Sequence, residues 1–137
     1  MTDLLFVYGT LMRVAAHAMH HVLARGSTFL GDAHFNGRLY LVAHYPGVVA
    51  ATAADERVFG EVYRMHNAVE LLQALDEYEA CAPNSPQPTE YIRSLCRVTL
   101  ADETPVESWV YLYNRPVESL PRIVSGSFLE HMRGCLS

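Results

Sequence analysis

Lysine is absent from this 137-residue sequence, and all ten basic residues are arginines. An enzyme that forms a Schiff base through lysine, attaches pyridoxal phosphate or uses a P-loop lysine is thereby excluded. Positive charge is scarce overall, because 15 acidic residues leave a net charge of −5. A protein that binds the phosphate backbone of a nucleic acid needs a basic surface. We therefore expect no nucleic-acid partner.

Long hydrophobic runs are missing as well. The apolar run Leu4–Val7 is far too short to span a bilayer, which takes about 20 residues. Asp3 precedes this run, no Lys or Arg does, and Gly9 interrupts the segment soon afterwards. A secretory signal carries positive charge before a longer apolar stretch. We therefore expect a cytoplasmic protein that has no membrane partner.

Cysteine is rare, and its spacing is uninformative. Cys81, Cys96 and Cys135 are an odd number and form no CxxC pair. We therefore expect neither a disulfide framework nor a thiolate zinc site. We expect reduced thiols in or near the core. Half of the residues are apolar, and the length suits one compact domain over residues 1–137. A monomer is the default expectation.

Apolar stretches rich in β-forming residues recur along the whole chain, separated by turn residues such as Asn36-Gly37 and Pro46-Gly47. The predicted strands are Asp3–Tyr8, Ser27–Phe35, Arg38–Ala43, Val58–Met65, Tyr91–Leu100 and Val106–Tyr113. The predicted helices are Arg13–Arg25, Ala68–Glu79 and a short one at Phe128–Gly134, which Ser127 would cap. About six strands with two or three flanking helices indicate an α+β domain built around a curled sheet or small barrel.

The second predicted helix places a carboxylate where an apolar residue is expected. Asn67 is a good N-cap, and Glu70 three residues later completes a capping box. With 3.6 residues per turn, Glu79 continues the apolar stripe of Leu72 and Leu75. Burial and the C-terminal end of a helix both raise a carboxyl pKa, which suits a general acid–base. The alternative is that the helix frays before Glu79 and leaves its side chain in water.

The end of the first predicted strand is a second candidate site. Tyr8-Gly9-Thr10-Leu11 follows directly on the buried run, and Gly9 allows the backbone to turn without a Cβ clash. Backbone N–H groups exposed at such a turn bind a carboxylate or polarise a carbonyl. Many strands end in a glycine turn, so this segment alone assigns no function.

Taken together, these segments resemble the gamma-glutamylcyclotransferase-like, AIG2-like family. The matching segments are Phe6–Leu11, Gly37-x-Leu39-Tyr40, Tyr45–Val49, Val58-x-Gly60-Glu61-Val62-Tyr63, Leu75–Glu79, Tyr91-x-Arg93 and Trp109-x-Tyr111-x-Tyr113. The resemblance runs from about residue 4 to residue 114. It implies a small mixed β-barrel with flanking helices and a cavity near the end of the first strand.

The resemblance also implies a reaction and a set of site residues. Family members cyclise a γ-glutamyl group to 5-oxoproline and release the amine or amino acid that it carried, without metal or other cofactor. Glu79 corresponds to the acid–base of the family. Tyr8, Gly9, Thr10 and Leu11 would line the substrate pocket, with Tyr91 beside it and Tyr111 and Tyr113 as weaker candidates for its wall. The expected partner is a small γ-glutamyl compound.

Two departures from the family pattern concern the segment after Glu79. Ala80 stands where the family often has Gly, and Cys81–Glu90 is long and contains Pro83, Pro86 and Pro88. This segment is a lid, a specificity element or a passive insertion. The substrate stays open among γ-glutamyl amino acids, γ-glutamyl amines, glutathione and a biosynthetic γ-glutamylated intermediate.

Three other functions are possible alternatives. His17, His20 and His21 have helical spacing for zinc, but Ala18 stands where an HExxH site needs Glu, and no third ligand is evident. A nucleophilic hydrolase using Cys81 or Ser125-Gly126-Ser127 lacks a GxSxG elbow. A non-catalytic binding module on the same scaffold is the main alternative, because fold alone does not establish function. The carboxylate at Glu79 favours an enzyme.

Overall fold

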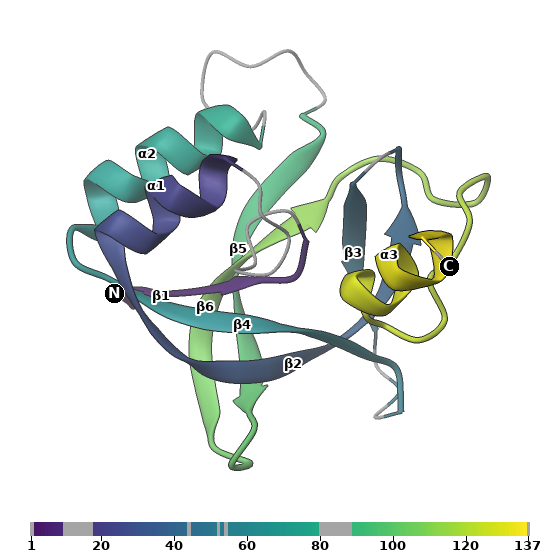
Figure 1. The fold of residues 1–137 in the computed structure, drawn as a ribbon, viewed down its shortest axis with the longest axis horizontal. Coiled ribbons are helices and arrows are strands. Elements are labelled where there is room, and N and C mark those ends of the chain that lie inside the picture. The colour runs from purple at the N-terminus through teal and green to yellow at the C-terminus, as the bar shows by residue number, and fades with distance from the viewer. Residues whose placement is uncertain are drawn as a thin grey trace.

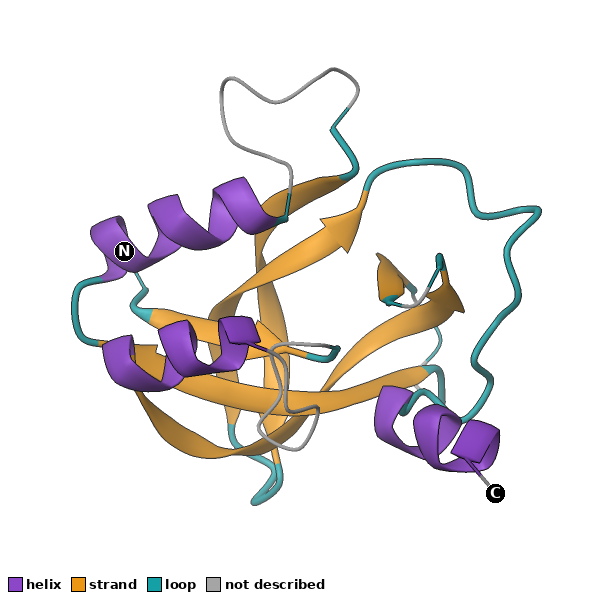
Figure 2. Ribbon diagram, turned by 45° about the horizontal axis from the view of Figure 1, so that its top comes forward, coloured by secondary structure: helices purple, strands orange, loops and turns teal. Residues whose placement is uncertain are grey.

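The computed structural model describes residues 2–9, 18–43, 45–51, 53, 55–79 and 89–136. Its strands form a barrel, and helices flank the barrel on two sides (Figures 1 and 2). In chain order the elements are β1 (Leu4–Val7), α1 (Ala18–Gly26), β2 (Ser27–Leu41), β3 (Pro46–Ala50), β4 (Arg57–Met65), α2 (Ala68–Tyr78), β5 (Tyr91–Leu100), β6 (Pro105–Tyr113) and α3 (Phe128–Leu136).

Five strands close into a mixed barrel. The strand order is β3-β2-β4-β1-β6-β5, and β5 pairs back onto β2 through Ala33↔Leu100 and His34↔Thr99. The β1–β6 pair is parallel, and the other pairs of the barrel are antiparallel. The sixth strand, β3, extends the sheet beside the far end of β2. The expected α+β fold with a small mixed β-barrel is therefore confirmed.

Two strand predictions were wrong, and both errors concern turn residues. The predicted strands Ser27–Phe35 and Arg38–Ala43 are joined in the single strand β2, which ends at Leu41. Asn36-Gly37 is not a turn, because β2 changes partner there from β4 to β3. Asn36 pairs with Arg57, and Gly37 pairs with Ala50. Pro46-Gly47 was expected as a turn but begins β3, where Pro46 occupies the first position of a strand at the sheet edge.

The helices pack as their sequence periodicity predicts. Leu71, Leu72 and Leu75 of α2 are buried, and Asn67 caps the helix by accepting a hydrogen bond from the Glu70 N–H at 3.3 Å. Ser127 caps α3 in the same way, through the Glu130 N–H at 3.2 Å. Helices α1 and α2 lie on one side of the barrel, and α3 lies on another side near β3 (Figures 1 and 2). The predicted start of the first helix, residues 13–17, lies outside the described residues.

Strand β4 lies very close to the end of its antiparallel neighbour β1 at Gly60. A Cβ added at Gly60 would lie 2.1 Å from the carbonyl oxygen of Val7 and 2.8 Å from Cζ of Phe6. Real Cβ atoms do not approach so closely, so only glycine allows this strand to pass the Phe6 ring. Phe6 in turn is buried in the core beside Phe35, with ring centroids 6.4 Å apart. This packing fixes the end of β1, where the predicted site residues begin.

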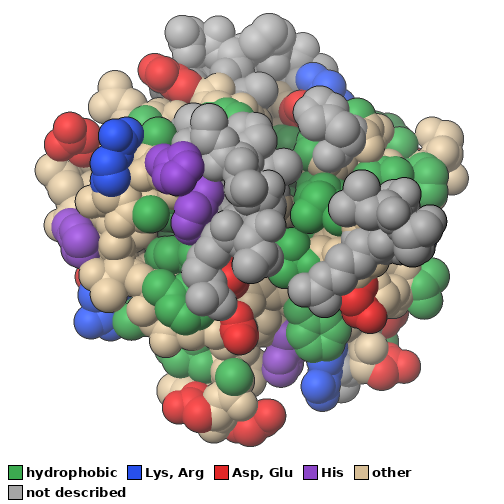
Figure 3. All heavy atoms as spheres, in the orientation of Figure 1, with side chains coloured by type: hydrophobic (Ala, Val, Ile, Leu, Met, Phe, Trp, Pro, Cys, Tyr) green, Lys and Arg blue, Asp and Glu red, His purple; other side chains and the backbone are tan. Residues whose placement is uncertain are grey.

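No helix in the described ranges is long and apolar enough to cross a membrane. On the face drawn in Figure 3, acidic and basic side chains are scattered among apolar and neutral ones in the described part of the surface.

Candidate active site

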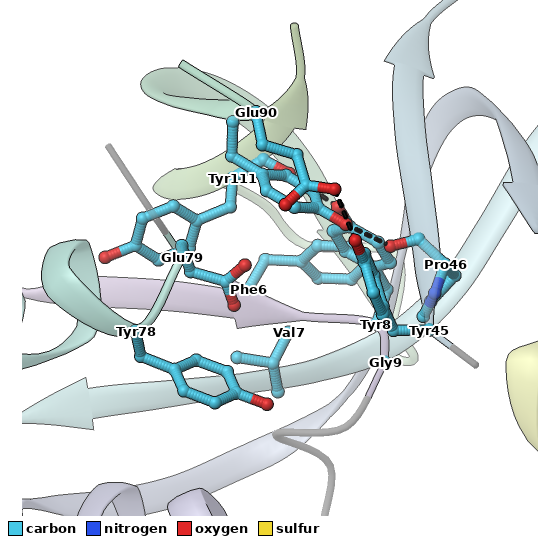
Figure 4. A pocket seen from close by; sticks show the side chains of 11 residues that line it. Phe6, Val7, Tyr8, Gly9, Tyr45, Pro46, Tyr78, Glu79, Glu90 and Tyr111 are labelled. Carbon is cyan, nitrogen blue, oxygen red and sulfur yellow. Dashed lines mark hydrogen bonds between the residues drawn. The ribbon is translucent and has the colours of Figure 1, made fainter. Parts of the chain in front are cut away.

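A cavity of about 240 Å³ opens where β1 ends beside the C-terminal end of α2 (Figure 4). It draws residues from distant parts of the chain. The described residues that line it are Phe6, Val7, Tyr8, Gly9, Tyr45, Pro46, Tyr78, Glu79, Glu90, Tyr91 and Tyr111. The lining therefore combines five tyrosines with two carboxylates, and none of these lining residues is cationic.

Glu79 is the first residue after α2 and presents its carboxylate to this cavity (Figure 4). Its backbone N–H donates to the Leu75 carbonyl at 2.8 Å, so the helix does not fray before it. Burial, which is the largest cause, and the negative charges of Glu90 and Asp76 together raise the pKa of Glu79 to about 8. The carboxyl group is thus poised to gain or lose a proton near neutral pH.

Asp76 ties the end of α2 to the barrel. Its carboxylate accepts two hydrogen bonds from Arg93, at 2.9 Å and 3.1 Å. The Tyr111 hydroxyl donates a third, at 2.7 Å. Arg93 also stacks its guanidinium over the Trp109 ring, 4.4 Å from the centroid. Because Asp76 precedes Glu79 by one helical turn, these contacts fix the backbone from which Glu79 projects.

The tyrosines at the end of β1 and the start of β5 are anchored through backbone carbonyls. Tyr8 donates to the carbonyl of Tyr111 at 2.6 Å, and Tyr91 donates to the carbonyl of Pro46 at 2.6 Å. Burial raises the pKa of both hydroxyls well above the ordinary tyrosine range, so both are neutral phenols. Each hydroxyl proton is donated to a backbone carbonyl, so the Tyr8 and Tyr91 rings form fixed walls of the cavity and do not act as acids.

Gly9 lies close to Pro46 across the cavity mouth. A Cβ at Gly9 would lie 2.8 Å from Cγ of Pro46. The glycine predicted to relieve a Cβ clash does so here, and the neighbour is a side chain of β3. Because Gly9 carries no side chain, it lines the cavity with its backbone.

Glu90 is the second carboxylate on the cavity, and Tyr45 donates a hydrogen bond to it (Figure 4). Burial, this hydrogen bond and the Glu90 charge together raise the pKa of Tyr45 to about 12. The backbone of Glu90 is held as well, because the Asn114 N–H donates to its carbonyl at 2.7 Å. Glu90 therefore has a defined position although it lies just before β5.

Of the residues predicted for the site, Glu79, Tyr8, Gly9, Tyr91 and Tyr111 line the cavity together. Tyr113 is not among the described lining residues. It lies behind Tyr91, with ring centroids 5.5 Å apart in an edge-on arrangement. Thr10 and Leu11 lie outside the described residues, as do Ala80 and positions 81–88 with Cys81.

The metal and hydrolase alternatives gain no support from the described residues. His17 lies outside them, and His20 packs edge-on against Tyr63, with ring centroids 6.2 Å apart. Within the described ranges, no three His, Cys, Asp or Glu side chains gather as metal ligands would. Cys96 is a free, partly buried thiol on β5, and Ser127 is engaged as a helix cap.

Sequence reasoning missed Asp76, Arg93, Tyr45 and Glu90 as parts of one site. The first three stand inside the segments that carry the family resemblance, but no periodicity or spacing shows that they meet. Glu90 directly precedes Tyr91 and belongs to no recognised pattern. Its position in the cavity follows from the β5–β6 pairing, which fixes Tyr91 opposite Tyr113.

Known proteins are similar to this chain in sequence and in fold. The profile of the family described as "Gamma-glutamyl cyclotransferase, AIG2-like" matches residues 5–130. A protein of Citrobacter rodentium named gamma-glutamylcyclotransferase family protein ytfP is 36% identical over 129 residues, which cover 92% of this chain and 95% of that protein. A gamma-glutamylaminecyclotransferase of Bos taurus is 35% identical over 117 residues, which cover 77% of this chain and 62% of that protein.

Solved structures of other proteins have a similar fold. The solution structure of ytfP from Escherichia coli superimposes with a TM-score of 0.63 at 33% identity, covering 94% of this chain and 98% of that one. The crystal structure of YkqA from Bacillus subtilis gives a TM-score of 0.74 at 27% identity. It is matched over the whole of this chain, which spans 44% of the length of YkqA. The chain therefore belongs to the gamma-glutamyl cyclotransferase, AIG2-like family.

Proposed function

We propose that the protein is a γ-glutamyl cyclotransferase, which converts a γ-glutamyl amine or amino acid into 5-oxoproline and the free amine. The observation that carries the proposal is the carboxyl of Glu79 on the cavity, with its pKa raised to about 8. Family membership and the relative named gamma-glutamylaminecyclotransferase support the reaction class.

In the proposed reaction, Glu79 carries protons between two nitrogens of the substrate. The α-ammonium group gives a proton to the Glu79 carboxylate, and the freed α-amine attacks the γ-carbonyl carbon. A new C–N bond closes the five-membered ring. Glu79 then protonates the departing nitrogen, and the original amide C–N bond breaks. The ring nitrogen then gives up its remaining extra proton, and the released amine takes up one proton. Overall the α-nitrogen loses two protons and the leaving amine gains two, so the reaction balances without water or an oxidant.

The burial of Glu79 suits this role. An ordinary surface glutamate has a pKa of about 4.3 and is a weak base near neutral pH. A pKa of about 8 makes Glu79 basic enough to take a proton from an ammonium group and acidic enough to return one. General acid–base catalysis of this kind contributes about 10²–10⁴ in rate.

Positioning supplies the rest of the acceleration, because the nucleophile and the carbonyl belong to one molecule. We propose that the walls of the cavity hold the γ-glutamyl chain bent, with its α-nitrogen toward Glu79. The anchored rings of Tyr8, Tyr91 and Tyr111 and the bare backbone at Gly9 support this proposal. Backbone N–H groups beside Gly9 would receive the substrate carboxylate or the developing oxyanion.

The test is the release of 5-oxoproline by purified protein from a panel of γ-glutamyl amino acids and γ-glutamyl amines, quantified by mass spectrometry. The proposal expects 5-oxoproline and the free amine in equal amounts from at least one panel member. A folded protein that releases none from any member would contradict it and favour a non-catalytic binding module.

A further inference from the structure

A γ-glutamyl cyclotransferase needs one carboxylate for the chemistry proposed above, but this cavity has two. Glu79 follows α2, whereas Glu90 comes from the segment before β5, and both line the same space (Figure 4). The Glu90 carboxylate is partly exposed, and its charge acts on Glu79. Glu90 helps raise the pKa of Glu79, and its own carboxylate can also pair with a positive charge on a ligand.

The surroundings of Glu90 suit an organic cation. Tyrosine rings at positions 45, 78, 91 and 111 line the cavity with it, and none of the described lining residues is Arg or His. Aromatic faces combined with a carboxylate are the environment in which proteins bind alkylammonium groups. Arg115, after β6, acts electrostatically on Tyr45 but does not line the cavity.

Glu90 is also held in place. Its backbone carbonyl accepts from the Asn114 N–H, and the Asn114 side chain donates to the carbonyl of Thr89 at 3.1 Å. Tyr45 binds the carboxylate from the β3 side of the cavity. A carboxylate fixed at both its backbone and its side chain loses little freedom when a ligand binds, which favours recognition.

We propose that Glu90, positioned by Tyr45, selects substrates whose leaving amine carries a second, positively charged group. This inference rests on the proposed function and narrows it. In the γ-glutamyl part of a substrate, the α-ammonium and α-carboxylate cancel, so only the leaving amine changes the net charge. A cationic leaving amine can pair with the negative charge of Glu90, whereas a neutral one leaves that charge unpaired by the substrate. The α-carboxylate of an amino acid is repelled by Glu90.

Three substrates of matched length separate these cases: the γ-glutamyl amides of 1,4-diaminobutane, of butylamine and of 4-aminobutyrate. We expect kcat/KM to be highest for the diamine amide, lower for the butylamine amide and lowest for the aminobutyrate amide. The gain from a charge-assisted hydrogen bond corresponds to about 10- to 100-fold between the first two. Glu90→Gln keeps the shape, removes the charge and should bring the diamine amide to the level of the butylamine amide.

Glu107→Gln is the matched control, because Glu107 is an exposed residue of β6 that does not line the cavity. It makes the same change in net charge and should leave the preference intact. Equal rates for the cationic and neutral substrates in the wild type would overturn the inference while leaving the proposed function in place. A preference for the cationic substrate that persists in Glu90→Gln would also overturn the inference and leave the proposed function in place.

Binding of compounds that cannot cyclise tests the same inference without turnover. The glutaryl amides of 1,4-diaminobutane and of butylamine lack the α-amino group, and titration calorimetry measures their affinities. We expect the compound that ends in an ammonium group to bind about 10-fold or more tightly than the compound that ends in a methyl group in the wild type, and the two to bind equally in Glu90→Gln. Equal affinities in the wild type would overturn the inference, whatever the outcome of the 5-oxoproline assay.

Discussion

Arg93 and Asp76 form a two-point ion pair, with Nε–Oδ1 at 2.9 Å and Nη2–Oδ2 at 3.1 Å. The pair joins strand β5 of the barrel to the last turn of the helix that precedes Glu79. Both side chains are mostly buried, at 24% and 16% exposure, so water screens the pair only in part. The base proposed for the reaction is thus braced against the barrel by a charged pair that does not itself line the cavity.

Replacing Arg93 by Gln should lower the free energy of unfolding by about 1–3 kcal/mol, because it leaves the Asp76 carboxylate with fewer donors and removes the stacking on Trp109. Arg97→Gln, at an exposed residue of the same strand, is the control and should change stability by less than about 0.5 kcal/mol. Urea unfolding of both variants measures the difference. Equal stabilities would show that the ion pair does not brace the helix.

Asp76→Asn should shift the acidic limb of the pH profile of kcat/KM toward lower pH. In the wild type we expect this limb near pH 8, because the base form of Glu79 must be present in the free enzyme. The negative charge of Asp76 contributes to the raised pKa of Glu79, so a neutral isostere lowers that pKa. Glu77→Gln removes a charge from the exposed side of the same helix and should leave the limb in place. If the limb does not move in Asp76→Asn, the charge of Asp76 does not contribute to the pKa of Glu79.

Glu79 should make the folded protein less stable as the pH rises. Its pKa is about 8 when folded, above the usual 4.3 of an unfolded chain, so the folded state binds the extra proton. The stability that this proton provides is fully present below pH 4.3 and is lost as the pH rises through 8. Between pH 5 and pH 9 the wild type should therefore lose at least about 1.4 kcal/mol more than Glu79→Gln, the equivalent of one pKa unit. Parallel losses in the two proteins would mean that Glu79 titrates at its ordinary value.

Gly60→Ala should destabilise the barrel strongly, by about 2 kcal/mol or more, because the new methyl group would meet the Val7 carbonyl at 2.1 Å. Gly31→Ala is the matched control, since a Cβ there meets nothing within 4 Å. We expect that control to be neutral or slightly stabilising, as alanine restricts the unfolded chain. Thermal unfolding of the two variants compares them directly. Similar melting temperatures would contradict the close approach of β1 and β4.

The sequence predicted the parts of this fold that local pattern controls. The amphipathic stripe of α2 and its Asn67 cap follow from helical periodicity and hydrogen-bonding chemistry, and both are confirmed. Pairing partners are not local, so the continuity of β2 through Asn36-Gly37 and the strand at Pro46 were missed. In both places a residue type that usually marks a turn lies instead where the sheet changes partner or has an edge.

In the candidate site too, the features set by local sequence pattern could be predicted, and those set by strand pairing could not. The helix that places Glu79 on the cavity could be predicted from its apolar stripe. The neighbours that raise its pKa could not, because Glu90 reaches the cavity only through the pairing of β5 with β6. The sequence argument attributed the shift to burial and the helix end. The structure retains burial as the largest cause and adds two carboxylates.

In the reaction proposed for this protein, Glu79 transfers the proton in a cyclisation that releases 5-oxoproline. Its most direct test is the rate of 5-oxoproline release by wild type, Glu79→Gln and Glu77→Gln on the best γ-glutamyl substrate. Gln keeps the size of the side chain but cannot act as a base, and Glu77 is an exposed neighbour on the same helix. We expect Glu79→Gln to lose about 10²-fold or more in kcat and Glu77→Gln to keep the wild-type rate. Release by a folded Glu79→Gln protein at the wild-type rate would contradict it.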